Sequence, residues 1–185
     1  HAVGVHGEGG CGLMGAQERE EDQKIVTASN ALGAQGGFVL CSRSCREVFS
    51  LVKSFPDIEF CLWAGRSLRG LADRASLLDL FEDLHQLELG YWHDAAVCAR
   101  RQQVLGEAQG EWLETFGNRC RGFSLGDASG EGMYLPPGSG GVDYGLLASY
   151  VRRSGAPTPV VLELDPSVPP SELAGMRACL DKHGL

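Results

Sequence analysis

Short apolar segments recur along the chain and alternate with longer amphipathic ones. The apolar segments are rich in Val, Phe, Leu and Trp, and they are continuous runs rather than strict alternations of apolar and polar positions. Such runs are typical of parallel strands that are covered on both faces. The pattern predicts strands at Ala2–His6, Gly37–Cys41, Ile58–Trp63, Glu88–Trp92, Gly122–Leu125 and Pro159–Leu164.

The amphipathic segments between these runs predict helices, because their apolar positions recur every three or four residues. Ala16–Leu32 begins with acidic residues, which suit the positive end of a helix dipole. Pro170 opens the last helix and Gly184 ends it. The remaining helices are expected at Cys45–Val52, after Ser76, at Ala95–Leu105 and Glu107–Phe116 (one helix interrupted near Gly106, or two), and at Asp143–Val151.

This order of elements gives roughly six strand–helix units of about 30 residues each, which is the pattern of an α/β protein with a parallel sheet. A doubly wound sheet and a β/α barrel both fit it. No long linker, charge block or low-complexity tract interrupts residues 1–185. We therefore expect a single domain.

Charge and hydropathy argue against two classes of partner. The 185 residues carry a formal net charge of −8 at pH 7, whereas affinity for nucleic acid comes mostly from Lys and Arg on phosphates. No apolar run approaches the roughly 18 residues that a membrane span needs. The seven cysteines are odd in number, form no C-x-x-C pair and lie mostly in apolar stretches. We expect buried, reduced thiols in a cytoplasmic protein without nucleic-acid or membrane partners.

Acidic residues stand at or near the ends of strand candidates, where α/β folds place their chemistry. Asp94 is either a metal ligand or the cap of the helix that starts at Ala95, and the local pattern favours the cap. Asp127 opens a loop that two prolines stiffen. Glu163 lies inside an apolar strand, where a carboxylate is not fully buried unless it is paired or bound to metal. A salt bridge with an arginine is the alternative for Glu163.

These motifs, in this order, resemble the xylose-isomerase-like TIM barrels, the superfamily of sugar-phosphate isomerases and epimerases and endonuclease IV. ELGYWHDAAVCAR is similar to the sixth strand of that family, GFSLGDASGEGMYLPPGSGGVDYGLL to the seventh, and VVLELDP to the eighth. ASNALGAQGGFVLCSRS resembles the fourth strand and VGVHG the third. The resemblance implies an α/β barrel of TIM type in which residues 1–185 supply the third to eighth strands.

The family builds a metal site from His, Glu and Asp at the carboxyl-terminal mouth of its barrel. The metal polarises a sugar carbonyl or hydroxyl, and two glutamates move the proton in many members. Acidic residues are kept at three of these positions, Asp94, Asp127 and Glu163, and His6 is a further match. The changed positions carry Cys41, Leu62 or Trp63, Val97, Ser124, Gly126 and the pair Met133-Tyr134.

The resemblance implies Glu163 and Asp94 as the catalytic residues. It implies substrate contacts from His93, Asp127, Trp63 and Tyr134. We expect no metal, because apolar and aromatic side chains refill the mouth. If a divalent metal is present (Zn, Mn or Mg), then Asp94, Glu163, His6 and Cys41 would hold it, and a Cys41 thiolate would select zinc.

Two functions from different classes follow. The first is a degenerate sugar-isomerase-like barrel that has lost most metal ligands and acts as a binding or structural subunit for a partner. The alternative is an active metal-dependent sugar (phosphate) isomerase or epimerase with a rearranged site that uses Asp94 and Glu163. A nuclease like endonuclease IV is disfavoured, because its three-metal site needs more ligands than are present and the acidic charge opposes DNA binding.

The length of the sequence bears on which partners the protein needs. A β/α barrel typically needs about 250 residues, whereas this sequence has 185. An incomplete barrel exposes two unpaired parallel edges. We therefore expect another protein chain, self-association or residues upstream of His1 to complete the barrel, and a small sugar-like molecule as a further ligand.

Overall fold

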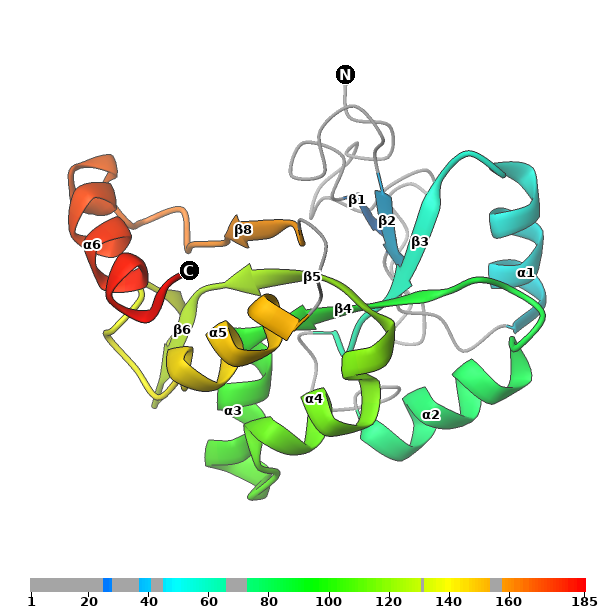
Figure 1. Ribbon diagram of the computed structural model, residues 1–185, viewed down its shortest axis with the longest axis horizontal. Helices are drawn as coiled ribbons and strands as arrows, with labels where there is room; N and C mark the ends of the chain where they lie inside the picture. The colour runs from blue at the N-terminus through cyan, green and yellow to red at the C-terminus, as the bar shows by residue number, and fades with distance from the viewer. Residues whose placement is uncertain (1–24, 28–36, 41–44, 66–72, 131, 154–157) are drawn as a thin grey trace. The chain divides into compact units, whose positions relative to one another are not determined.

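The computed structural model describes residues 25–27, 37–40, 45–65, 73–130, 132–153 and 158–185. The chain falls into two compact units, His1–Trp92 and His93–Leu185, and the boundary between them lies inside one strand. In both units helices connect successive parallel strands (Figure 1). The protein is therefore an α/β protein, as the sequence predicts, and its organisation as one domain stays a prediction.

The first unit is built around β3 (Glu59–Leu62), which is parallel to both of its neighbours. These neighbours are β2 (Gly37–Leu40) and the start of β4 (Gly90–Asp94). Helix α1 (Cys45–Ser54) connects β2 to β3, and α2 (Arg74–Asp83) connects β3 to β4. Each of these strands and helices overlaps an element that the sequence predicts.

Helix α2 shows how the sequence pattern becomes packing. It begins after Asp73, whose carboxylate accepts a hydrogen bond of 2.7 Å from the backbone N–H of Ser76. Such a cap satisfies a donor that the helix itself leaves without a partner. Leu77, Leu80 and Phe81, at helical spacing, are buried, and each contributes about 1.5–3 kcal/mol of hydrophobic stabilisation.

Strand β1 (Ile25–Thr27) corrects the sequence prediction. A helix is expected over Ala16–Leu32, but Ile25–Thr27 form a strand antiparallel to β2, with Val26 beside Val39. Three consecutive β-branched residues fit a pleated sheet better than a helix, and this local preference prevails over the acidic start of the segment. The rest of that predicted helix and the predicted strand Ala2–His6 lie outside the described residues.

The second unit begins with the last two residues of β4 and continues into α3 (Ala95–Leu105) and α4 (Gln109–Phe116). The sequence leaves open whether this stretch is one helix or two, and the structure has two. Gly106 ends α3 with a φ of 74°, in the left-handed region. Glycine adopts that conformation without the steric cost that other residues incur, which is why the helix stops there.

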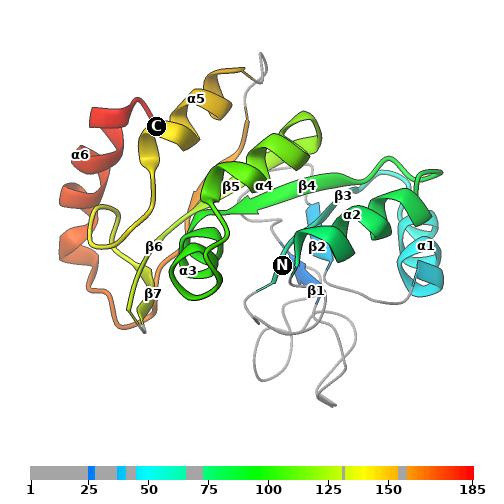
Figure 2. The ribbon, with the colours of Figure 1, turned by 90° about the horizontal axis from the view of Figure 1, so that it is seen from below.

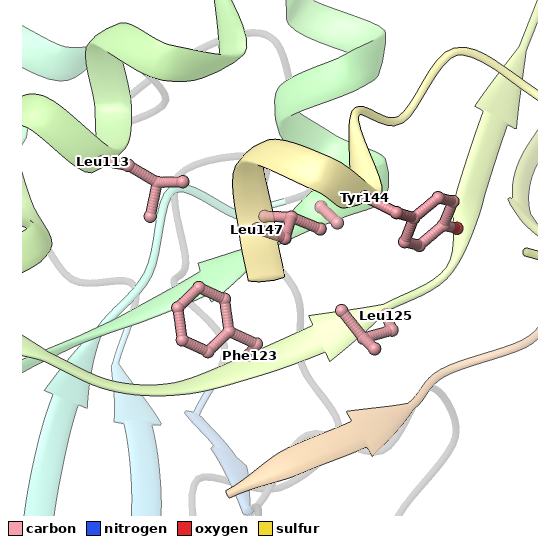
Figure 3. Close-up of a cluster of buried hydrophobic side chains, with 6 residues drawn as sticks. Leu113, Phe123, Leu125, Tyr144 and Leu147 are labelled. Carbon is pink, nitrogen blue, oxygen red and sulfur yellow. The ribbon is translucent and has the colours of Figure 1, made fainter. Parts of the chain in front are cut away.

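The remaining large elements of this unit are β5 (Cys120–Leu125), α5 (Tyr144–Arg153), β8 (Val160–Leu162) and α6 (Leu173–His183). Strands β5 and β8 are parallel. Side chains from α3, α4, β5 and α5 meet in a buried apolar cluster (Figure 3). Its members are Ala95, Leu113, Phe123, Leu125, Tyr144 and Leu147.

A hairpin lies between β5 and α5, where the sequence predicts a loop that begins at Asp127. Its strands are β6 (Asp127–Ser129) and β7 (Gly132–Leu135), which are antiparallel. They lie beside α3 (Figure 2). Strands of three and four residues are too short for the periodic signal on which sequence prediction depends.

The described strands do not close into a barrel within either unit: in the first unit the pairings are β1–β2–β3–β4, and in the second β8 pairs with β5. Parallel strands with helical connections are therefore observed, and the TIM barrel remains a hypothesis. No helix among the residues that the structure describes has both the length and the apolar character to cross a bilayer.

Candidate functional site

Several predicted site residues lie at the carboxyl ends of strands in the second unit. Asp94 is the last residue of β4, Asp127 follows β5 after one residue, and Glu163 follows β8 directly. The backbone N–H of Glu163 donates to the carbonyl of Leu125 at 3.0 Å, so the ends of β5 and β8 lie side by side. Tyr134 belongs to the hairpin strand β7.

Asp94 is buried, and each of its carboxylate oxygens accepts a hydrogen bond from within the chain. Oδ1 accepts from the backbone N–H of Val97 at 3.0 Å and so caps α3. Oδ2 accepts from the hydroxyl of Tyr134, also at 3.0 Å. The cap that the sequence predicts is confirmed, whereas nothing in the sequence pattern indicates the tyrosine partner.

Tyr134 has an unusual backbone conformation. Its φ is 58°, and it is the one non-glycine residue of the described chain with a positive φ. For a bulky side chain this conformation costs on the order of 1–3 kcal/mol. The carbonyl of Tyr134 accepts a hydrogen bond of 2.8 Å from the backbone N–H of Asp165. Tyr134 therefore joins the hairpin to Asp94 through its side chain and to the segment after β8 through its backbone.

Asp127 is completely buried and holds the connection between β5 and α5. Its Oδ1 accepts hydrogen bonds from the backbone N–H groups of Ala128 (2.9 Å) and Val142 (3.0 Å). Its Oδ2 accepts from the N–H of Gly138 at 3.0 Å. These three amides come from a connection that is otherwise rich in glycine and proline. In this arrangement the carboxylate organises the loop, and the predicted contact of Asp127 with substrate stays a prediction.

Two glycines allow the backbone to pass close to these groups. A Cβ atom at Gly126 would collide with the carbonyl oxygen of Glu163 and would lie 3.2 Å from the Cα of Tyr134. A Cβ atom at Gly140 would collide with the carbonyl oxygen of Ala128. Glycine at position 126 therefore fits the close approach of the two backbone segments.

Glu163, the predicted catalytic carboxylate, is half-buried and lies one residue beyond β8. Trp63, one residue beyond β3 in the first unit, is 8% exposed. His6 and Cys41 lie outside the described residues.

The described residues of the second unit do not fit a divalent cation. Within the described ranges, no group of three or more His, Cys, Asp and Glu side chains comes together in a way that could hold a metal ion. A cation of this kind needs several ligands that converge on one point. The oxygens of Asp94 and Asp127 instead accept hydrogen bonds from the protein's own donors. The expectation of an empty mouth stays a prediction, since two proposed ligands are not described.

His93 is completely buried beside an aromatic ring and a thiol. Its ring meets that of Phe123 edge-on, with 5.7 Å between the ring centroids, and its Nδ1 lies 3.9 Å from Sγ of Cys98. Burial lowers the pKa of His93 to about 3, so the imidazole is neutral near pH 7. These neighbours and this burial are typical of a core residue. The predicted contact of His93 with substrate stays a prediction.

We expect acid to destabilise the protein through His93. An unfolded histidine has a pKa of about 6.5, whereas burial lowers that of His93 to about 3. The unfolded state therefore binds more protons between these values. The stabilisation is complete above about pH 6.5 and falls as the pH drops toward 3, with a slope approaching about 1.4 kcal/mol per pH unit. Urea denaturation between about pH 4 and 7 measures this slope.

The variant His93→Gln should show a smaller slope than the wild-type protein over the same pH range. His85→Gln is the matched control, because the side chain of His85 is exposed. Equal slopes in wild type and His93→Gln would contradict the prediction.

The fold has a distant counterpart among solved structures. No protein-family model matches the chain, and no curated protein matches it. The crystal structure of 3-keto-D-glucoside 4-epimerase, YcjR, from E. coli, in its apo form, is similar to 77% of this chain, with a TM-score of 0.51 and 14% sequence identity. The match covers 56% of that protein's chain. At this level of identity the similarity concerns the fold alone, and it is a fold that a sugar epimerase uses.

Proposed function

We propose that this chain is part of a TIM barrel of the xylose-isomerase-like type that has lost its metal site and serves as a binding or structural subunit for a partner. One observation carries the proposal. Asp94, a ligand position that the resemblance marks as kept, has both carboxylate oxygens engaged by the N–H of Val97 and the hydroxyl of Tyr134. A carboxylate whose two oxygens already accept hydrogen bonds from the protein is poorly placed to bind a cation as well.

The exposure of Asp94 supports the same proposal. A general acid or base must come within hydrogen-bond distance of the substrate atom whose proton it moves. Asp94 is 2% exposed, and its Oδ2 accepts a hydrogen bond from the hydroxyl of Tyr134, which is itself buried. A substrate atom that bonded Oδ2 would compete with this hydroxyl.

A partner strand that completes the barrel is a further part of the proposal. Strand β8 is apolar, and Val160 at its start is 39% exposed. Among the described strands of its unit, β8 pairs with β5 on one side. Exposed strand edges carry N–H and C=O groups that readily pair with another strand. A second copy of this chain or another protein chain could supply it.

The second candidate function is an active sugar isomerase or epimerase that uses Glu163 and Asp94. Two observations favour it. The structural neighbour is a 3-keto-D-glucoside 4-epimerase. Glu163 is half-buried at the carboxyl end of a parallel strand, where α/β enzymes place catalytic groups. In that case Zn, Mn or Mg would polarise the sugar oxygen, and Glu163 would move the proton.

One assay separates the two functions. Purified protein is incubated with a 3-keto-D-glucoside, with and without Mn²⁺, Zn²⁺ or Mg²⁺, and its metal content is measured. We expect no turnover and less than one bound ion per chain. Turnover together with a stoichiometric ion would overturn the proposal in favour of the second function.

In the case of turnover, Glu163→Gln should lower the rate by about a hundredfold or more, as expected for the loss of a general acid or base. Glu172→Gln is the matched control, because Glu172 is an exposed glutamate of the same unit. Equal rates in the two variants would exclude Glu163 as the catalytic group.

A further inference from the structure

The ring of Tyr134 packs against small residues. It belongs to a buried cluster with Ala96 and Ala99 of α3 and Ala128 of β6. On another side lies Gly126, where a Cβ atom would lie 3.3 Å from the ring. Larger side chains at these positions would displace the ring. The surroundings therefore fit one placement of the phenol, with its hydroxyl on Asp94.

The same residue is conformationally strained, and its contacts offset the strain. The φ of 58° is unfavourable for tyrosine, yet the backbone keeps it. Two hydrogen bonds hold it there, one from the hydroxyl to Asp94 Oδ2 and one from the N–H of Asp165 to the carbonyl. The bond to a carboxylate is the stronger kind, because charged acceptors roughly double the strength of a hydrogen bond.

We infer that Tyr134 performs here the structural task of a metal ion. An ion at the mouth of such a fold ties together residues from several strands. Tyr134 joins the end of β4, through Asp94, to the segment that follows β8, through Asp165, and it does so from the hairpin between them. The inference rests on the proposed function, since it takes the metal site as replaced, and it adds the residue that replaced it.

A double-mutant cycle tests this crosslink. Tyr134→Phe removes the hydroxyl and keeps the ring. Asp94→Ser keeps a residue that caps helices, but its side chain is too short to reach Tyr134. Each single change should raise the equilibrium constant for unfolding about tenfold or more, as for a hydrogen bond to a charged group. Both changes remove the same hydrogen bond, so their effects should not multiply in full. The increase in the unfolding constant of the double variant should be about tenfold smaller than the product of the two single increases.

Tyr144→Phe supplies the matched control. Tyr144 is also a buried tyrosine of the second unit, but its hydroxyl donates to the carbonyl of Gly126 at 3.3 Å. The unfolding constant of the double variant Tyr144→Phe with Asp94→Ser should therefore change by the product of the two single effects, to within about twofold. Multiplicative effects for Tyr134→Phe with Asp94→Ser would overturn the inference.

A second measurement addresses the metal directly. Dialysis of the wild-type protein against EDTA should leave its melting temperature unchanged, and Mn²⁺ or Zn²⁺ should not restore that of Tyr134→Phe. A decrease in the melting temperature of the wild-type protein on EDTA treatment, as large as the decrease caused by Tyr134→Phe, would overturn the inference. Turnover of the 3-keto-D-glucoside that persists after EDTA treatment, in a wild-type protein that retains the coupling, would instead overturn the proposed function alone.

Discussion

Replacement of Asp127 by alanine is expected to lower the free energy of unfolding by about 3–5 kcal/mol, because each buried donor left without a partner costs about 1–3 kcal/mol. The carboxylate holds the amides of Ala128, Gly138 and Val142, and it is fully buried. Alanine offers no acceptor to any of them. Urea denaturation of the purified variant measures the loss, and the connection from the hairpin to α5 should become the first region to exchange its amide hydrogens.

The variant Asp127→Asn tests the mechanism of this loss. An asparagine keeps one carbonyl oxygen and places an NH₂ group where the second oxygen was. It can satisfy the amides of Ala128 and Val142 through one oxygen but not that of Gly138 as well. We therefore expect a loss smaller than that of the alanine variant. Equal stability of Asp127→Asn and the wild type would contradict the account of the carboxylate as the organiser of this loop.

Gly126→Ala should cost about 3 kcal/mol or more, at or beyond the upper end of the range for overpacked sites. The added methyl group collides with the backbone oxygen of Glu163 and presses on the Cα of Tyr134. Neither is the end of a flexible side chain, so the strand ends themselves would have to separate. Chemical denaturation measures the loss.

Gly175→Ala is the matched control for this change. Gly175 lies in α6, and no heavy atom stands within 4 Å of an added Cβ. The same substitution should therefore stabilise the protein by about 0.5–1 kcal/mol through helix propensity. A stabilising effect of alanine at Gly126 would show that β5 and the segment after β8 do not approach as closely as described.

The sequence predicts the repeated elements of this fold because their signals are local. Asp94 precedes a helical pattern and caps the helix that follows, as the sequence predicts, whereas the helix expected after Ser76 begins earlier, after the cap residue Asp73. Gly106 marks a helix end through its own conformational preference. The prediction is wrong at Ile25–Thr27. The segment as a whole favours a helix, whereas these three β-branched residues fit a pleated sheet, and they pair with β2 as a strand.

The candidate site is only partly visible in the sequence. The sequence pattern places Asp94 and Asp127 at or near strand ends, and the structure agrees, whereas Glu163, which the pattern places inside a strand, lies one residue beyond β8. The sequence does not reveal that the donors for Asp94 and Asp127 come from the chain itself. Tyr134 lies 40 residues from its partner Asp94. No local sequence pattern predicts a tyrosine with a positive φ, because that conformation depends on contacts that form only in the folded protein.

The left-handed backbone at Tyr134 has a consequence for how this chain can diverge. Tyrosine is a poor choice for that conformation, whereas glycine and asparagine adopt it readily. The hydrogen bond from its hydroxyl to Asp94 offsets part of this cost. Without an acidic residue at position 94, the unfavourable backbone conformation of Tyr134 would lose this compensation. We therefore expect simultaneous changes at the two positions to be tolerated better than a change at either one alone.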